Sequence, residues 1–165
     1  MIKLCINNNL QKTLEENNIN VKDYVPAYNG ESAGLDLYNT GKNISVMPES
    51  ADLVGKKNYP KLLIPTGLKV SIPKGYVGII QERGSIVKTP LKVRAGIIDS
   101  GYTGEIFVNC INVAKHEFTI YKQSKLPFQL IVVKCDNEFE VVSEEEYLNL
   151  SRDSSRKEGK VGSSD

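Results

Sequence analysis

The sequence predicts an all-β domain, built as a sandwich, a barrel or a jelly roll, and three observations support this class. Short runs rich in β-branched and aromatic residues follow one another along the chain, and several of them alternate apolar with polar positions. Turns containing Gly and Pro separate these runs. Patterns typical of helices are scarce. The length of 165 residues corresponds to about one domain.

The expected strands follow from the apolar runs, taken in chain order. They are residues 62–64, 68–72, 76–80, 105–111 and 130–133. The turns between them are marked by 65–67, 73–75, 100–101 and 103–104, which all contain Gly. Short strands at this spacing, separated by Gly and Pro, are typical of sandwiches, barrels and jelly rolls.

Two short helices are expected outside this β pattern. Residues 10–17 have the spacing of a first helix, and residues 143–150 have the spacing of a second. Ser143 is placed to cap the second helix, and Glu144 to Glu146 would lie in its first turn.

Composition excludes several classes of function. The formal net charge is +1, which argues against a basic nucleic-acid-binding surface. No apolar run approaches the roughly 18 residues of a membrane helix, and the start of the chain does not resemble a signal peptide. We therefore expect neither a nucleic-acid partner nor a membrane, and a cytoplasmic location.

The three cysteines, Cys5, Cys110 and Cys135, do not have the spacing of a metal site or an even number for a closed disulfide framework. His116 is the single histidine, so a Cys–His nucleophile is also a poor interpretation. We expect these thiols to be small buried apolar groups in a reducing compartment.

The chain divides into a β domain, residues 1–150, and a polar tail, residues 151–165. The tail consists largely of Ser, Gly, Lys and Arg, and Val161 is its single apolar residue. Composition alone predicts a frayed terminus. Within the β domain, residues 48–59 are expected to form an inserted surface loop.

The densest chemical signal lies in residues 95–105, where an apolar stretch runs into Asp99, a Gly-containing turn, Tyr102 and a further strand. We expect a hairpin with a carboxylate and an aromatic ring near its bend. On its own this pattern indicates no more than a hairpin, because Asp is common in turns.

Five segments in order resemble the motifs of the trimeric dUTP diphosphatases, or dUTPases. They are Ala33-Gly34-Leu35-Asp36-Leu37, Arg83-Gly84-Ser85-Ile86, Gly96-Ile97-Ile98-Asp99 with Tyr102 and Gly104-Glu105, Leu126-Pro127-Phe128-Gln129-Leu130-Ile131, and Arg156-Lys157-Glu158-Gly159-Lys160-Val161-Gly162-Ser163-Ser164. The resemblance implies a jelly-roll-like β-clip subunit with few short helices and a flexible C-terminal tail. It also implies a homotrimer in which the tail closes over a neighbouring subunit's active site.

The resemblance implies hydrolysis of dUTP to dUMP and pyrophosphate. Asp99 would activate a water that attacks the α-phosphorus, and Tyr102 would exclude a ribose 2′-hydroxyl. The substrate-binding residues would be Arg83, Gly84, Ser85, Val93, Gly96, Ile97, Ile98, Gln129, Arg156, Val161, Gly162, Ser163 and Ser164. The two arginines suit phosphate because a guanidinium matches phosphate oxygens with a planar pair of donors.

The resemblance further implies Mg²⁺ as cofactor, held mainly by the substrate phosphates, with Asp36 touching its water shell. The activity would limit uracil incorporation into DNA and supply dUMP. Departures from the usual motifs, such as Glu82 before Arg83 and Val161 in place of Phe, are consistent with a viral or phage origin. For a virus, the location would be the host cytoplasm or nucleus.

Three alternatives remain open. A dCTP deaminase needs a Glu on the strand after the hairpin, where this chain has Asn109. A non-catalytic, nucleotide-gated regulator would explain the altered second and fifth motifs. A structural, capsid-like jelly roll would explain the β pattern but not the order of the motifs.

Overall fold

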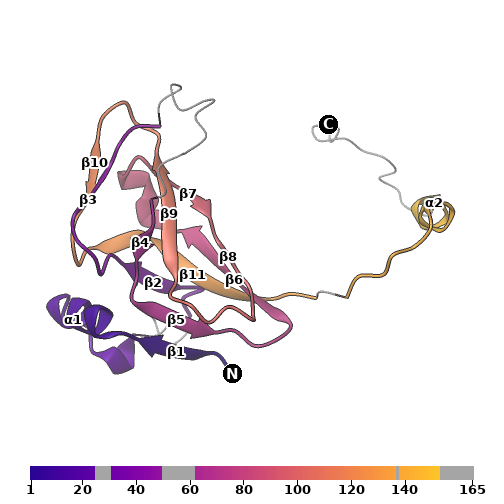
Figure 1. The fold of residues 1–165 in the computed structure, drawn as a ribbon, viewed down its shortest axis with the longest axis horizontal. Helices are drawn as coiled ribbons and strands as arrows, with labels where there is room; N and C mark the ends of the chain where they lie inside the picture. The colour runs from indigo at the N-terminus through magenta and orange to yellow at the C-terminus, as the bar shows by residue number, and fades with distance from the viewer. Residues whose placement is uncertain (25–30, 50–61, 137, 153–165) are drawn as a thin grey trace.

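The β-rich body of the molecule confirms the predicted all-β class (Figure 1). The structure is a computed structural model that describes residues 1–24, 31–49, 62–136 and 138–152. In these residues the paired strands run antiparallel in four small sheets. Their strand orders are β2-β11-β6-β8, β4-β9-β7, β1-β5 and β10-β3.

The strands are β1 Lys3–Ile6, β2 Leu35–Tyr38, β3 Ile44–Val46, β4 Ile64–Pro65, β5 Leu68–Ser71, β6 Tyr76–Glu82, β7 Leu91–Ala95, β8 Ile97–Ile98, β9 Phe107–Asn112, β10 Phe118–Ile120 and β11 Lys125–Lys134. The helices are α1 Asn8–Glu16 and α2 Glu144–Arg152, with short 3₁₀ helices η1 Val21–Asp23 and η4 Gly84–Lys88.

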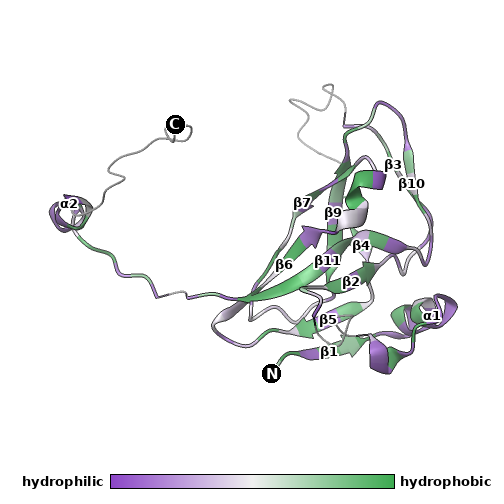
Figure 2. Ribbon diagram, turned by 180° about the vertical axis from the view of Figure 1, so that it is seen from behind, coloured by the Kyte–Doolittle hydropathy of each residue, from purple (hydrophilic) through white to green (hydrophobic). Residues whose placement is uncertain are grey.

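Strand β11 organises the largest sheet, because it pairs with β2 on one side and with β6 on the other. Leu126, Phe128 and Leu130 alternate into the core, and Figure 2 shows the apolar character of β6 and β11. The strand begins five residues before the predicted 130–133. Pro127 is tolerated there because the β2 register shifts between Lys125 and Gln129, so that a bulge accommodates the missing N–H.

The predicted hairpin around Asp99 is present, but the apolar residues directly before Asp99 do not pair with its second arm. The two arms that pair are β7 and β9, from Leu91↔Asn112 to Ala95↔Asn109. Strand β8, which runs into Asp99, leaves this pair and joins β6 instead. The crossing is possible because Gly96 approaches the backbone of β6 more closely than a residue with a Cβ atom could.

Strand β9 starts at Phe107 and not at the predicted residue 105. Glu105 and Ile106 are used to hold a neighbouring turn: the Glu105 carboxylate accepts a hydrogen bond from the N–H of Gly67, and the Ile106 carbonyl accepts one from the hydroxyl of Thr66. These contacts fix the loop between β8 and β9 to the turn that precedes β5.

Both predicted helices are confirmed. In α1, the side chain of Asn7 accepts a hydrogen bond from the N–H of Leu10 at 2.9 Å, which caps the first turn. Leu10 and Leu14 are fully buried and pack into the main apolar cluster. The turn at Gly67 lies directly against this cap, with a positive φ of 68° that favours glycine.

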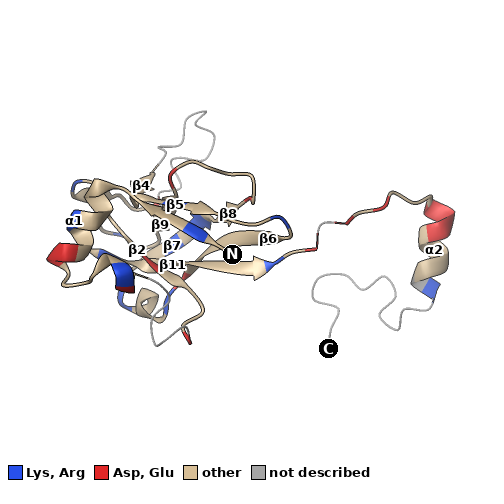
Figure 3. Ribbon diagram, turned by 90° about the horizontal axis from the view of Figure 1, so that it is seen from below, with Lys and Arg blue, Asp and Glu red and all other residues tan. Residues whose placement is uncertain are grey.

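Helix α2 lies at the end of an arm that leads away from the sheets after β11 (Figure 1). Ser143 accepts a hydrogen bond from the N–H of Glu146 at 3.2 Å, as expected of a cap. Figure 3 shows the acidic first turn of α2 and the basic residue, Arg152, at its other end. This charge order complements the helix dipole. In the part of the chain that the structure describes, no helix has the length and apolarity to cross a membrane.

The expectation of buried cysteines holds for Cys110 but is wrong for Cys5, which is exposed; Cys135 is half-buried. Cys5 lies on β1, in which Lys3 and Leu4 are exposed as well, so neither face of this part of the strand is covered. Most of the expected insertion, residues 48–59, lies outside the described residues, as does nearly all of the tail.

Candidate functional site

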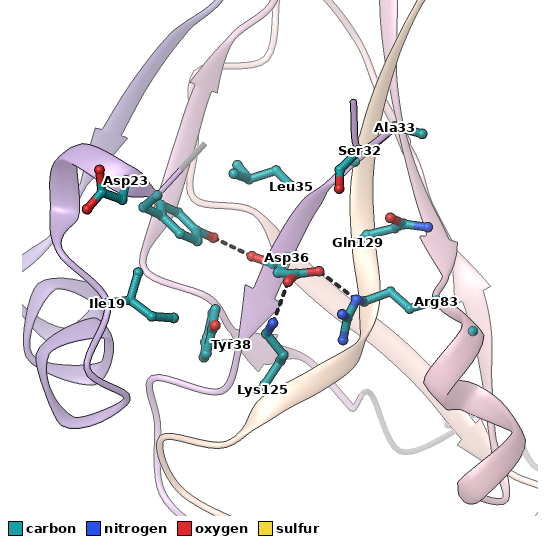
Figure 4. Close-up of a pocket in the computed structure, with 13 residues that line it drawn as sticks. Ile19, Asp23, Ser32, Ala33, Leu35, Asp36, Tyr38, Arg83, Lys125 and Gln129 are labelled. Carbon is teal, nitrogen blue, oxygen red and sulfur yellow. Dashed lines mark hydrogen bonds and ion pairs between the residues drawn. The ribbon is translucent and has the colours of Figure 1, made fainter. Parts of the chain in front are cut away.

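A pocket of about 450 Å³ opens where β2, β11 and the end of β6 meet the N-terminal segment that follows α1 (Figure 4). Four residues of the predicted site line it. They are Asp36, Arg83, Gly84 and Gln129. The remaining lining residues are Ile19, Asp23, Tyr24, Ser32, Ala33, Gly34, Leu35, Tyr38 and Lys125.

The carboxylate of Asp36 lies between two cations. Its Oδ1 atom is 2.5 Å from Nε of Arg83, and its Oδ2 atom is 2.5 Å from Nζ of Lys125 (Figure 4). Asp36 lies opposite Gln129 in the β2–β11 ladder, and Arg83 directly follows β6. The four charged residues that line the pocket, Asp23, Asp36, Arg83 and Lys125, sum to zero, but both cations stand beside Asp36, so this wall of the pocket can receive an anionic group.

Two tyrosines support Asp36 from the other side of the pocket. The hydroxyl of Tyr24 donates a hydrogen bond to the backbone carbonyl of Asp36 at 2.5 Å, and its ring meets that of Tyr38 edge-on, with centroids 6.2 Å apart. Burial raises the pKa of Tyr24 well above its ordinary value, helped by the proximity of Tyr38 and Asp36. The hydroxyl therefore stays protonated and remains a donor.

Gln129 is positioned by a close approach to the backbone of Gly34. A Cβ atom on Gly34 would come within 2.5 Å of Oε1 of Gln129, so a larger residue there would force the Gln129 amide to shift. The Gln129 amide donates to the carbonyl oxygen of Glu82 at 3.3 Å. The amide group thus links the first, second and fourth motifs of the sequence at one place.

The third motif forms a second structural unit, beside β6. The N–H of Ile80 donates to the carbonyl of Gly96 at 2.7 Å, and Ile97 and Ile98 continue the pairing with β6. Asp99 is exposed, with its carbonyl accepting a hydrogen bond from the N–H of Tyr102. The Tyr102 hydroxyl donates to the carbonyl of Glu105 at 2.7 Å.

Asp99 and Arg83 do not meet within this chain. Ile98, the residue before Asp99, lies opposite Gly78 on β6. Arg83 comes five residues after Gly78, just beyond the end of β6. At about 3.3 Å per residue, this separation is roughly 17 Å along the sheet. The structure therefore brings together the first, second and fourth motifs and leaves the third apart from them.

Two residues predicted to bind the substrate, Val93 and Ser85, make hydrogen bonds to other residues of the chain. The N–H of Val93, expected to face the base, donates to Oε1 of Glu82 at 3.3 Å. Ser85, expected to bind phosphate, is exposed and accepts a long hydrogen bond of 3.5 Å from Nη1 of Arg83. Gly84 has open space around it, as a residue whose backbone meets a ligand requires. Arg156, Val161, Gly162, Ser163 and Ser164 lie outside the described residues.

The residues near Asp36 do not form a protein-held site for Mg²⁺. In the described ranges, no group of three or more His, Cys, Asp or Glu side chains could hold a metal ion. Both oxygens of the Asp36 carboxylate already face cations. A divalent ion carried on the phosphates of a nucleotide would need no such cluster of protein ligands.

Sequence reasoning missed Lys125, Tyr24 and Glu82. Lys125 stands directly before the fourth motif, and a signal was available, because a lysine at the start of a strand next to a site is a candidate ligand. Tyr24 precedes Asp36 by twelve residues, and nothing in the sequence links the two. Glu82 was noticed only as a departure from the motif, although its carboxylate bonds both Val93 and the ammonium of Lys92.

A sequence model of the dUTPase family matches residues 21–165. The chain belongs to the dUTPase family. It is similar to the deoxyuridine 5′-triphosphate nucleotidohydrolase of Fusobacterium nucleatum, with 33% identity over 132 residues, covering 78% of this chain and 83% of that protein. The enzyme of the same name from Dictyoglomus turgidum is 34% identical over 111 residues, covering 62% of this chain and 67% of its own length. That of Ictalurid herpesvirus 1 is 40% identical over 133 residues, and this chain spans 60% of it.

Solved structures of dUTPases share the fold. A variant of the Staphylococcus phage 80alpha dUTPase, solved with dUpNHpp, matches with a TM-score of 0.67 and 20% identity, covering 100% of this chain and 99% of that one. A variant of the phage phi11 dUTPase, whose structure describes the coordination of a structural Mg(II) ion, matches with a TM-score of 0.63 and 23% identity, covering 88% and 99%. The dUTPase fold and the predicted family are thereby confirmed.

Proposed function

We propose that this dUTPase-family protein hydrolyses dUTP to dUMP and pyrophosphate. The observation that carries the proposal is the pair of cations, Arg83 and Lys125, held beside Asp36 in a pocket of a chain whose family match extends across all five motifs. An arginine and a lysine at one pocket wall suit the phosphates of a nucleoside triphosphate. The two relatives solved with dUpNHpp or described as dUTP hydrolases are consistent with this substrate.

In the proposed reaction, the carboxylate of Asp99 orients a water molecule and accepts a proton from it as the water attacks the α-phosphorus. Pyrophosphate leaves, with Mg²⁺ arriving on the substrate and neutralising phosphate charge. The ring of Tyr102 lies against the deoxyribose, and backbone groups of Gly96, Ile97 and Ile98 read the uracil edge. Because Asp99 is exposed, its carboxylate is accessible to water and substrate without rearrangement of the core.

We also propose that the working form is a homotrimer in which motifs from different subunits share each site. The separation of Asp99 from Arg83 supports this, because one subunit does not bring the two groups around one substrate. Closed cyclic symmetry is a common route to such shared sites. A monomer by light scattering at micromolar concentration that still hydrolyses dUTP would contradict the trimer.

The decisive experiment incubates the purified full chain with Mg²⁺ and, separately, dUTP, dCTP, dTTP and UTP. Pyrophosphate released from dUTP in preference to the other three supports the proposal. Ammonia from dCTP would instead identify a deaminase, and binding without turnover would identify a nucleotide-gated regulator. The proposed place of action is the cytoplasm, or the host cytoplasm or nucleus for a viral protein.

A further inference from the structure

Lys125 is a second cation of the pocket that lies outside the sequence motifs. Its Nζ atom is 2.5 Å from Oδ2 of Asp36 and 5.8 Å from the centre of the Tyr38 ring. A carboxylate and an aromatic face therefore hold the ammonium in place. Its side chain is 41% exposed, so a ligand in the pocket can also reach it.

Both oxygens of the Asp36 carboxylate have a cation beside them. Arg83 faces Oδ1 and Lys125 faces Oδ2. A hydrated divalent cation that approaches this carboxylate must share an oxygen with one of the two, and their positive charges oppose its approach. The ammonium of Lys125 thus occupies the place from which a metal ion would link Asp36 to a phosphate.

An ammonium group can itself make that link. Lysine has three N–H donors and no acceptor, so one donor can remain on Asp36 while the others reach phosphate oxygens. Arg83 adds the planar pair of donors from the neighbouring strand end. A triphosphate bound here would meet two cationic side chains before any metal ion contributes.

We propose that Lys125 bridges Asp36 and the substrate phosphates, so that nucleotide binding by this protein depends only weakly on Mg²⁺. The inference deepens the proposed function and rests on it, since it names how the same pocket receives the phosphates. Replacing Lys125 by an uncharged side chain frees Oδ2 of Asp36 and makes binding depend on the metal.

The test is isothermal titration of the full-length protein with dUpNHpp, in EDTA and in excess Mg²⁺. For the wild type we expect the two dissociation constants to agree within about threefold. For Lys125→Met we expect binding in EDTA to weaken about tenfold, the scale of one lost charge-assisted contact, while binding in Mg²⁺ stays close to the wild type.

Two matched variants control for net charge and for the lysine itself. Lys134→Met removes one positive charge from the other end of the same strand, so it should behave as the wild type. Lys125→Arg keeps a cation beside Asp36 and should restore metal-independent binding. Thermal melting of all variants checks that the fold is retained, which the exposure of Lys125 leads us to expect.

Two results would overturn the inference: a wild type whose binding already weakens tenfold in EDTA, or a Lys125→Met variant with the same metal dependence as the wild type. In both cases dUpNHpp still binds, so the proposed function stands. Absence of dUpNHpp binding to the wild type under both conditions would overturn the proposed function together with this inference.

Discussion

The carbonyl oxygen of Gly96 accepts a hydrogen bond of 2.7 Å from the N–H of Ile80, and this contact fixes the third motif to the central sheet. A Cβ atom at position 96 would lie 2.7 Å from the carbonyl oxygen of Ile80, where backbone cannot move aside cheaply. The glycine is therefore a steric requirement of the crossing between β7 and β8.

We predict that Gly96→Ala lowers the free energy of unfolding by about 1–3 kcal/mol, the usual cost of overpacking. Urea denaturation followed by circular dichroism measures the loss. Gly101→Ala is the matched control, because open space surrounds that glycine, and it should change stability by less than about 0.5 kcal/mol. Equal stability of the two variants would show that the Gly96 backbone can shift.

We predict that Asp99→Asn leaves the fold and dUpNHpp binding nearly unchanged and lowers kcat on dUTP by roughly 10²–10⁴-fold, the range of general base catalysis. The amide keeps the shape of the carboxylate and loses its basicity. Because Asp99 is exposed, no buried contact is broken. Steady-state kinetics and titration calorimetry separate the two effects, and a variant with half of the wild-type kcat would exclude Asp99 as the base.

We predict that Tyr102→Ala reduces discrimination between dUTP and UTP, while Tyr102→Phe retains it. Both variants lose the hydroxyl bond to the Glu105 carbonyl, but only alanine removes the ring proposed to face the sugar. The ratio of kcat/KM for the two nucleotides measures the effect. Loss of discrimination in the phenylalanine variant as well would assign sugar selection to loop order, which the hydroxyl maintains.

We predict that the Cys110 thiol resists alkylation by iodoacetamide at pH 8 in the native protein, whereas the exposed Cys5 reacts. Burial raises the pKa of Cys110 from 9.0 to about 12, so the reactive thiolate is scarce and shielded. Mass spectrometry of peptides after timed labelling identifies the reacted thiols. Labelling of Cys110 as fast as Cys5 would contradict its burial.

The same pKa shift predicts how stability changes at high pH. The pKa of Cys110 is higher in the folded state than in the unfolded chain, so its contribution is complete below about pH 9. The contribution decreases as the pH rises from 9 toward 12, because the unfolded thiol ionises first. We expect the difference between the urea midpoints of the wild type and Cys110→Ala to become smaller as the pH rises through this range. The methyl-sized cavity of the variant adds a constant part to this difference, which is subtracted first.

Some strands and helices could be predicted from the sequence and others could not, and the reasons are physical. Long alternating runs such as β6 were predicted, because burial of one face of a strand places an apolar residue at every second position. Strands of three residues, such as β3 and β10, carry too few positions for a period and were not predicted. The pairing of β8 with β6 could not be predicted either, since a local sequence pattern does not specify which distant strand is the partner.

The sequence by itself determined the β class, both helices with the Ser143 cap, and the five motifs that identify the family, because these depend on local periodicity and on residue order. Only the tertiary structure decided that Asp36 meets Arg83 and Lys125, and that Asp99 lies away from them. The physical reason is that strand pairing and register, which join residues distant in the chain, set these distances. Which charges meet in the pocket therefore follows from the β2-β11-β6-β8 order of the sheet.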